Sequence, residues 1–150
     1  MFSGRTLAAI SIPSSATAGC SAYHYALLAV GMFVESRCPH GAYVTGDIDR
    51  EQAEQIASWA NGLLDEPVDL PVCVDPDRLY RRVSELYGEE RLAIPRSTAL
   101  FLGRPSELWT AIVQYVDVST LRGWVTECLE SFDSLHSRGA VYYAFRYLEA

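Results

Sequence analysis

Residues 42–74 constrain the fold more than any other part of the chain, because they carry three structural signals in order. Residues 42–45 predict a strand, residues 50–64 have the spacing of an amphipathic helix, and residues 68–74 predict a second strand. This order and length are typical of a β-α-β unit. The sequence therefore predicts an α/β or α+β fold with a small sheet and a β-α-β unit at about 42–74.

The rest of the chain predicts mostly helices. Residues 7–12 suit a short first strand, and the helix predicted at 22–37 is apolar nearly all round, which is typical of a buried central element. Asp75 and Pro76 mark a helix start, and Gly88 marks its end. Residues 92–102 fit a strand or a helix. Helices are predicted at 106–116, 119–132 and 139–148, so the C-terminal half is helical.

Composition sets limits on size and partners. The chain has 150 residues, of which 49% are hydrophobic and 21% charged, as expected of one globular domain spanning 1–150. The aromatic-rich helix ends at the last residues, so the chain also fits the N-terminal part of a longer parent protein. The net charge is −7, and the local cluster Arg78, Arg81 and Arg82 is followed by glutamates. We interpret that cluster as a solvated, salt-bridged helix face, and expect no nucleic-acid binding.

Membrane insertion is not expected either. The longest apolar run, residues 22–34, is shorter than the ~20 residues that a spanning helix needs. The sequence before Cys20 resembles a lipoprotein cleavage site, but its apolar region at 7–12 is short and Pro13 interrupts it. The sequence therefore favours a cytoplasmic protein.

Two acidic turns precede predicted helices at the ends of predicted strands. Asp47 and Asp49 form one turn, and Asp75 and Asp77 form the other. Their oxygens could ligate Mg²⁺ in a small metal-dependent enzyme or ligand-binding domain. Alternatively, they cap the orphan N–H groups of the helices that follow, which explains the residue types without a metal and is the interpretation we favour.

No other motif indicates catalysis. The glycine pair of residues 41 and 46 is followed by Asp47 instead of a P-loop lysine, and no nucleophile elbow is present. The four cysteines are scattered, and Cys73 and Cys128 occupy apolar patterns that predict burial. We expect no catalytic residue, no cofactor and no metal.

Aromatic residues provide candidate anchors for a protein partner. Trp59 and Trp124 fall on apolar helical stripes and are predicted to lie in the core. The partner-binding candidates are Tyr142, Tyr143 and Tyr147 of the last predicted helix, together with Trp109.

Several short runs carry a resemblance to known proteins. They are Gly46-Asp47-Ile48, Gln52-Ala53, Trp59-Ala60-Asn61, Leu70-Pro71-Val72 and Leu79. In these runs the region from Tyr25 to Arg82 resembles small, acidic, uncharacterised proteins of GC-rich bacteria, some associated with toxin neutralisation. The resemblance brings no catalytic signature and no functional residues. It implies a non-catalytic immunity or adaptor protein whose acidic, aromatic surface binds a protein partner, such as a basic toxin or effector.

Overall fold

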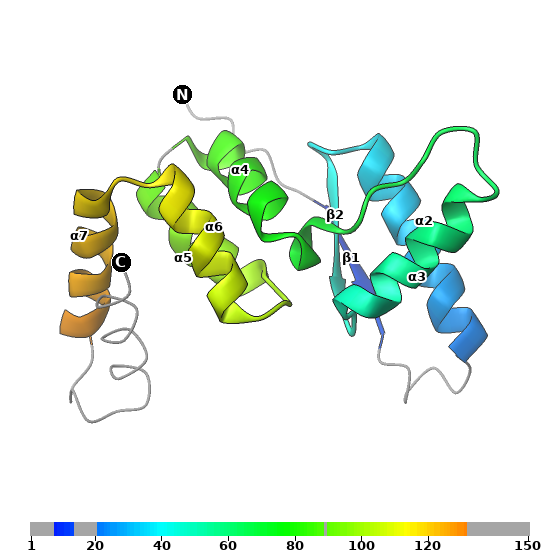
Figure 1. Cartoon of the computed structure of the whole chain (residues 1–150), viewed down its shortest axis with the longest axis horizontal. Helices are drawn as coiled ribbons and strands as arrows, with labels where there is room; N and C mark the ends of the chain where they lie inside the picture. The colour runs from blue at the N-terminus through cyan, green and yellow to red at the C-terminus, as the bar shows by residue number, and fades with distance from the viewer. Residues whose placement is uncertain (1–7, 14–20, 89, 132–150) are drawn as a thin grey trace.

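The computed structural model describes residues 8–13, 21–88 and 90–131, and it combines a small sheet with several helices (Figure 1). The elements are β1 (Ala8–Ile12), α2 (Ser21–Arg37), β2 (Ala42–Gly46), α3 (Arg50–Asn61), the 3₁₀ turn η1 (Val72–Val74), α4 (Pro76–Tyr87), α5 (Glu90–Leu100), α6 (Pro105–Tyr115) and α7 (Val118–Glu130). Helices α2 and α3 lie on one side of the sheet, and α4 to α7 lie on the other (Figure 1). The predicted α/β or α+β class with a helical C-terminal half is confirmed.

The two strands are parallel, and α2 is the crossover that joins them. Ala8 pairs with Ala42 and Ile12 pairs with Gly46, so the β-α-β unit spans residues 8–46. Gly46 has φ +120° at the end of β2, and a Cβ atom there would lie 2.1 Å from the Ile12 carbonyl oxygen. Only glycine fits a backbone approach this close.

The prediction of a strand at 68–74 is wrong. The other two elements of the predicted β-α-β unit, the strand at 42–45 and the helix at 50–64, are confirmed as β2 and α3. Side chains take the hydrogen bonds that a neighbouring strand would make. The Asn61 amide accepts from the Val68 N–H at 2.7 Å and donates to the Val68 carbonyl at 3.1 Å. The Val72 N–H donates to the Glu35 carboxylate at 2.9 Å. Because these backbone groups are already satisfied, the segment runs beside β2 without joining the sheet.

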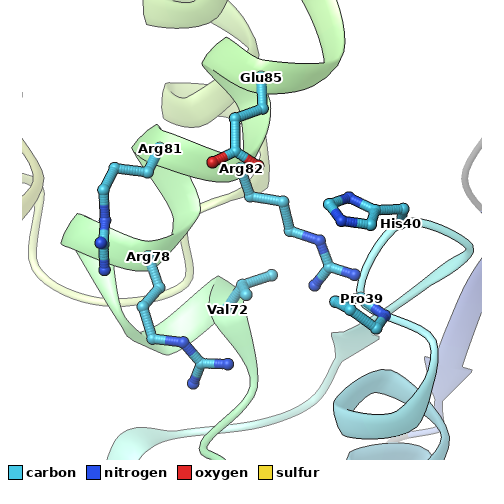
Figure 2. Close-up of a pocket in the computed structure, with 7 residues that line it drawn as sticks. All are labelled: Pro39, His40, Val72, Arg78, Arg81, Arg82 and Glu85. Atoms are coloured by element: carbon cyan, nitrogen blue, oxygen red, sulfur yellow. The ribbon is translucent and has the colours of Figure 1, made fainter.

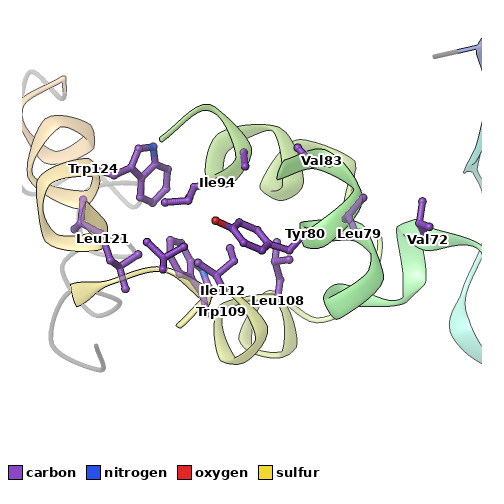
Figure 3. Close-up of a cluster of buried hydrophobic side chains, with 13 residues drawn as sticks. Val72, Leu79, Tyr80, Val83, Ile94, Leu108, Trp109, Ile112, Leu121 and Trp124 are labelled. Atoms are coloured by element: carbon purple, nitrogen blue, oxygen red, sulfur yellow. The ribbon is translucent and has the colours of Figure 1, made fainter. Parts of the chain in front are cut away.

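The buried apolar side chains form two clusters that meet at η1. One cluster joins α2, α3 and the sheet and includes Cys73 and Val74. The other fills the space between α4, α5, α6 and α7, and Val72 belongs to it (Figure 3). Consecutive residues of this 3₁₀ turn therefore pack into two different hydrophobic clusters.

Helix α2 is not buried all round, in contrast to the expectation. His24, Leu28 and Met32 face the core, whereas Tyr23 and Val30 are 56% and 61% exposed. The described residues provide packing partners on one side of α2 only, so its apolar residues divide into a core face and an outer face.

The C-terminal half follows the predicted pattern. The Asp75 side chain caps α4, and Gly88 ends it with φ +67°. The ambiguous segment 92–102 is largely helix α5, and the next two helices lie within a residue or two of their predicted bounds. The helix predicted at 139–148 lies outside the described residues.

Candidate functional site

One aspartate of each acidic turn caps the N-terminus of the helix that follows it. Asp49 accepts a hydrogen bond from the Gln52 N–H at 2.8 Å, and Asp75 accepts one from the Arg78 N–H at 3.1 Å. These bonds satisfy orphan donors of α3 and α4 and place negative charge at the positive ends of the helix dipoles. The capping prediction is therefore confirmed for both residues.

The other two acids of these turns are placed differently. Asp77 lies in the first turn of α4 and accepts a hydrogen bond from the Tyr115 hydroxyl at 3.3 Å, and Asp47 follows β2 directly. Among the described residues, no three histidine, cysteine, aspartate or glutamate side chains gather closely enough to hold a metal ion.

Of the predicted aromatic anchors, Trp109 lies within the described residues. Trp109 is 6% exposed, and its ring centroid lies 5.3 Å from that of Trp124 in the core of the helical half. It therefore offers little surface to a partner. Tyr142, Tyr143 and Tyr147 lie outside the described residues, and their role stays a prediction.

Trp59 lies on the surface of α3. It is 61% exposed, although its position predicted a core residue. The buried residues of α3 are Ala53, Ile56, Ala57 and Ala60. At ~100° per residue Trp59 lies about 100° from the middle of that stripe, at the edge of the helix face.

An apolar groove of 330 Å³ runs beside Trp59 between α2 and α3. Its walls are Ala22, Tyr25 and Ala26 of α2, with Gln55, Ile56 and Trp59 of α3. Leu63 follows Trp59 by four residues and is 69% exposed. Contiguous exposed apolar surface of this kind is characteristic of sites that bind other molecules.

The segment that contains α3 is acidic. The segment 47–69, which contains α3, holds a single arginine and seven acidic side chains: Asp47, Asp49, Glu51, Glu54, Asp65, Glu66 and Asp69. Arg37 and Arg78 from outside the segment pair with Glu66 and Asp69. Since more acids than cations remain, the segment that supplies the α3 wall of the groove carries a net negative charge.

The sequence did not predict the buried ion pair that joins the two halves. Glu35 of α2 is 3% exposed, and its carboxylate accepts from Val44 N–H at 2.6 Å, from Val72 N–H at 2.9 Å and from Arg82 Nη1 at 3.1 Å. Arg82 of α4 also donates to the Ala42 carbonyl at 2.7 Å. Arg82 is 8% exposed. The prediction that the arginine cluster forms a solvated helix face is therefore wrong for this residue.

Burial dominates the electrostatics of this pair. Loss of solvation raises the pKa of Glu35 above its ordinary value, while the hydrogen bonds from Val72 and Val44 and the charge of Arg82 act in the opposite direction. Loss of solvation lowers the pKa of Arg82 in the same way, against the charge of Glu35. An acid within an otherwise apolar helix was the available signal, but its partner lies 47 residues away in sequence.

The three cysteines within the described residues are either small buried apolar residues or surface thiols. Cys73 is fully buried, and burial raises its pKa to about 12, which removes thiolate character at neutral pH. Cys128 is partly buried, as expected, and Cys38 is exposed. No helix in the described part of the chain is both long and apolar enough to cross a membrane.

Comparisons of the chain with protein-family models, curated proteins and solved structures found no match.

Proposed function

We propose that this chain is a non-catalytic binding protein of the immunity or adaptor type, and that its α2–α3 groove holds an apolar side chain of a basic protein partner. The observation that carries the proposal is the exposure of Trp59 at the edge of an apolar groove. Tryptophan is among the residues that most often dominate binding energy at protein interfaces.

The exposed part of Trp59 is large enough to matter for affinity. A tryptophan side chain offers about 200 Å² of surface, and about 60% of it would be removed from water by a partner. At about 25 cal/mol per Å², this burial is worth about 3 kcal/mol, or about a hundredfold in Kd.

The net charge of segment 47–69 favours one kind of partner. The acidic segment 47–69 would attract a partner with lysine or arginine residues around its apolar anchor, and it would repel an acidic one. Surface charge of this kind acts mainly on the association rate, so binding should slow as the salt concentration rises.

Site-specific photo-crosslinking in the native host tests this proposal. A photoreactive amino acid replaces Trp59 in one variant and Val113 in a matched control, since Val113 is 44% exposed on α6 and far from the groove in sequence. We expect a crosslink from position 59 to one basic protein and none from position 113. A crosslink only to a second copy of the chain, or equal products from both positions, would contradict the proposal.

The isolated partner then gives a quantitative test. Trp59→Ala should weaken its Kd about 30- to 100-fold, whereas Val113→Ala should change it less than twofold. If the predicted tyrosines Tyr142, Tyr143 and Tyr147 belong to the same surface, their replacement by alanine should weaken binding as well.

A further inference from the structure

Three arginine side chains of α4 lie around one pocket on a different part of the molecule (Figure 2). The pocket has a volume of 180 Å³ and lies between α4, η1 and the turn that connects α2 to β2. Arg78, Arg81, Arg82 and Glu85 come from α4, and His40 comes from the turn. Residues of this turn follow the end of α2, whereas the apolar groove uses its beginning.

Two of the guanidinium groups are held in place by backbone carbonyls. Arg78 donates to the Leu70 carbonyl at 2.8 Å and pairs with Asp69 at 3.0 Å. Arg82 donates to the Ala42 carbonyl at 2.7 Å, in addition to its pair with Glu35. These contacts fix the two cationic walls before any ligand arrives, which reduces the entropy cost of binding.

Arg81 differs from Arg78 and Arg82, because no carboxylate of the described residues neutralises its guanidinium group. It is exposed, and within the described part of the chain it makes neither a salt bridge nor a side-chain hydrogen bond. In Figure 2 its guanidinium group extends toward the same end of α4 as that of Arg78, and the His40 ring lies on the opposite wall. An arginine in this position can donate two parallel hydrogen bonds to an oxyanion.

Glu85 makes the pocket selective. Its carboxylate lies on the same wall of α4 and forms no salt bridge within the described residues, so it opposes the binding of a bare anion. A ligand that carries a hydroxyl or amino group beside its oxyanion turns this repulsion into a hydrogen bond.

We propose that the pocket binds a small phosphate monoester, with its phosphoryl oxygens on Arg81 and Arg78 and a hydroxyl group of its organic part on Glu85. A phosphoryl group has three oxygens and about two negative charges, so it can use several cationic walls at once. A planar carboxylate with two oxygens uses fewer of them. This inference does not depend on the protein-binding proposal.

Isothermal titration of the full chain with glycerol 3-phosphate, inorganic phosphate and glycerol tests the assignment. We expect glycerol 3-phosphate to bind more tightly than inorganic phosphate, and glycerol to give no signal. Arg81→Gln should weaken glycerol 3-phosphate about tenfold, because a charge-assisted hydrogen bond is lost. The matched control is Arg104→Gln, which removes an exposed arginine at the start of α6 and should leave the Kd unchanged.

A second variant separates the monoester from a bare anion. Glu85→Gln should tighten the binding of inorganic phosphate, since a repulsive charge is removed. The difference between the affinities for inorganic phosphate and for glycerol 3-phosphate should then become smaller. No binding of glycerol 3-phosphate at millimolar concentration would overturn the proposal. Equal affinities for the monoester and inorganic phosphate, or equal losses in Arg81→Gln and Arg104→Gln, would overturn it too.

Discussion

Replacing Arg82 by methionine removes the cation of the buried pair and keeps most of the side chain's length. Glu35 would then keep its two backbone N–H donors but lose the buried counter-charge that the described residues provide, and the Ala42 carbonyl would lose a donor at 2.7 Å. Breaking a buried ion pair by removing one partner costs about 3–5 kcal/mol. Native domains have free energies of unfolding of about 5–15 kcal/mol, so the variant should fold with much lower stability.

The size of this loss should depend on pH, and the sign follows from the pKa of Glu35. Burial raises that pKa in the folded protein, and the charge of Arg82 lowers it, so it rises further when Arg82 is removed. Between the unfolded pKa near 4.5 and the raised folded pKa, the folded state binds more protons. Its stability therefore falls as the pH rises through this window, and more steeply in the variant than in the wild type.

Each pH unit between these two pKa values contributes at most about 1.4 kcal/mol to the fall in stability. We therefore expect Arg82→Met to lose about 3–5 kcal/mol near pH 7. The loss should be smaller near pH 4.5, because a protonated Glu35 needs no counter-charge.

Urea denaturation followed by circular dichroism at both pH values measures these differences. Arg50→Met is the matched control, because Arg50 pairs with Glu54 at 3.0 Å on the surface and its loss should cost less than about 0.5 kcal/mol. Adding Glu35→Gln to Arg82→Met should recover part of the loss near pH 7, since no buried carboxylate remains, while one of the two backbone N–H groups loses its acceptor because the amide nitrogen of glutamine cannot accept. A loss equal to that of Arg50→Met, or one that does not change with pH, would refute the reasoning.

Three further predictions concern single positions. Gly46→Ala should lower the free energy of unfolding by more than about 2 kcal/mol, since its Cβ would collide with the backbone of β1, whereas Gly123→Ala should raise stability slightly because open space surrounds it. Urea denaturation compares the two variants. Asn61→Leu should cost about 2–4 kcal/mol by the same measurement, because two backbone groups of the following segment lose their partner. In the native protein at mildly alkaline pH, mass spectrometry should find Cys38 alkylated well before Cys73, and equal rates would contradict the burial of Cys73.

Local signals in the sequence predicted much of the fold. The acids at 49 and 75 mark helix starts because the cap and the N–H groups it satisfies are neighbours in the chain. Strand β2 and helices α3 and α4 were predicted for the same reason, since their periodicity and end signals are local.

The rest depends on contacts between distant residues. Residues 68–74 have the composition of a strand, but Asn61 and Glu35 take their backbone hydrogen bonds, and no local pattern reports this. The exposure of Trp59 depends on where α2 lies, and apolar stripes do not distinguish a groove from a core. The candidate site was therefore the part that sequence reasoning missed.

The three tryptophans divide between the two halves of the molecule. Trp59 is largely exposed to water beside the groove, while Trp109 and Trp124 pack together inside the helical half. Their intrinsic emission therefore contains two separable components: a red-shifted one that acrylamide quenches, and a blue-shifted one that it does not reach. Occupation of the groove would shield the first component from acrylamide and leave the second unchanged. The fluorescence of the unlabelled protein therefore distinguishes binding at the groove from loosening of the helical core.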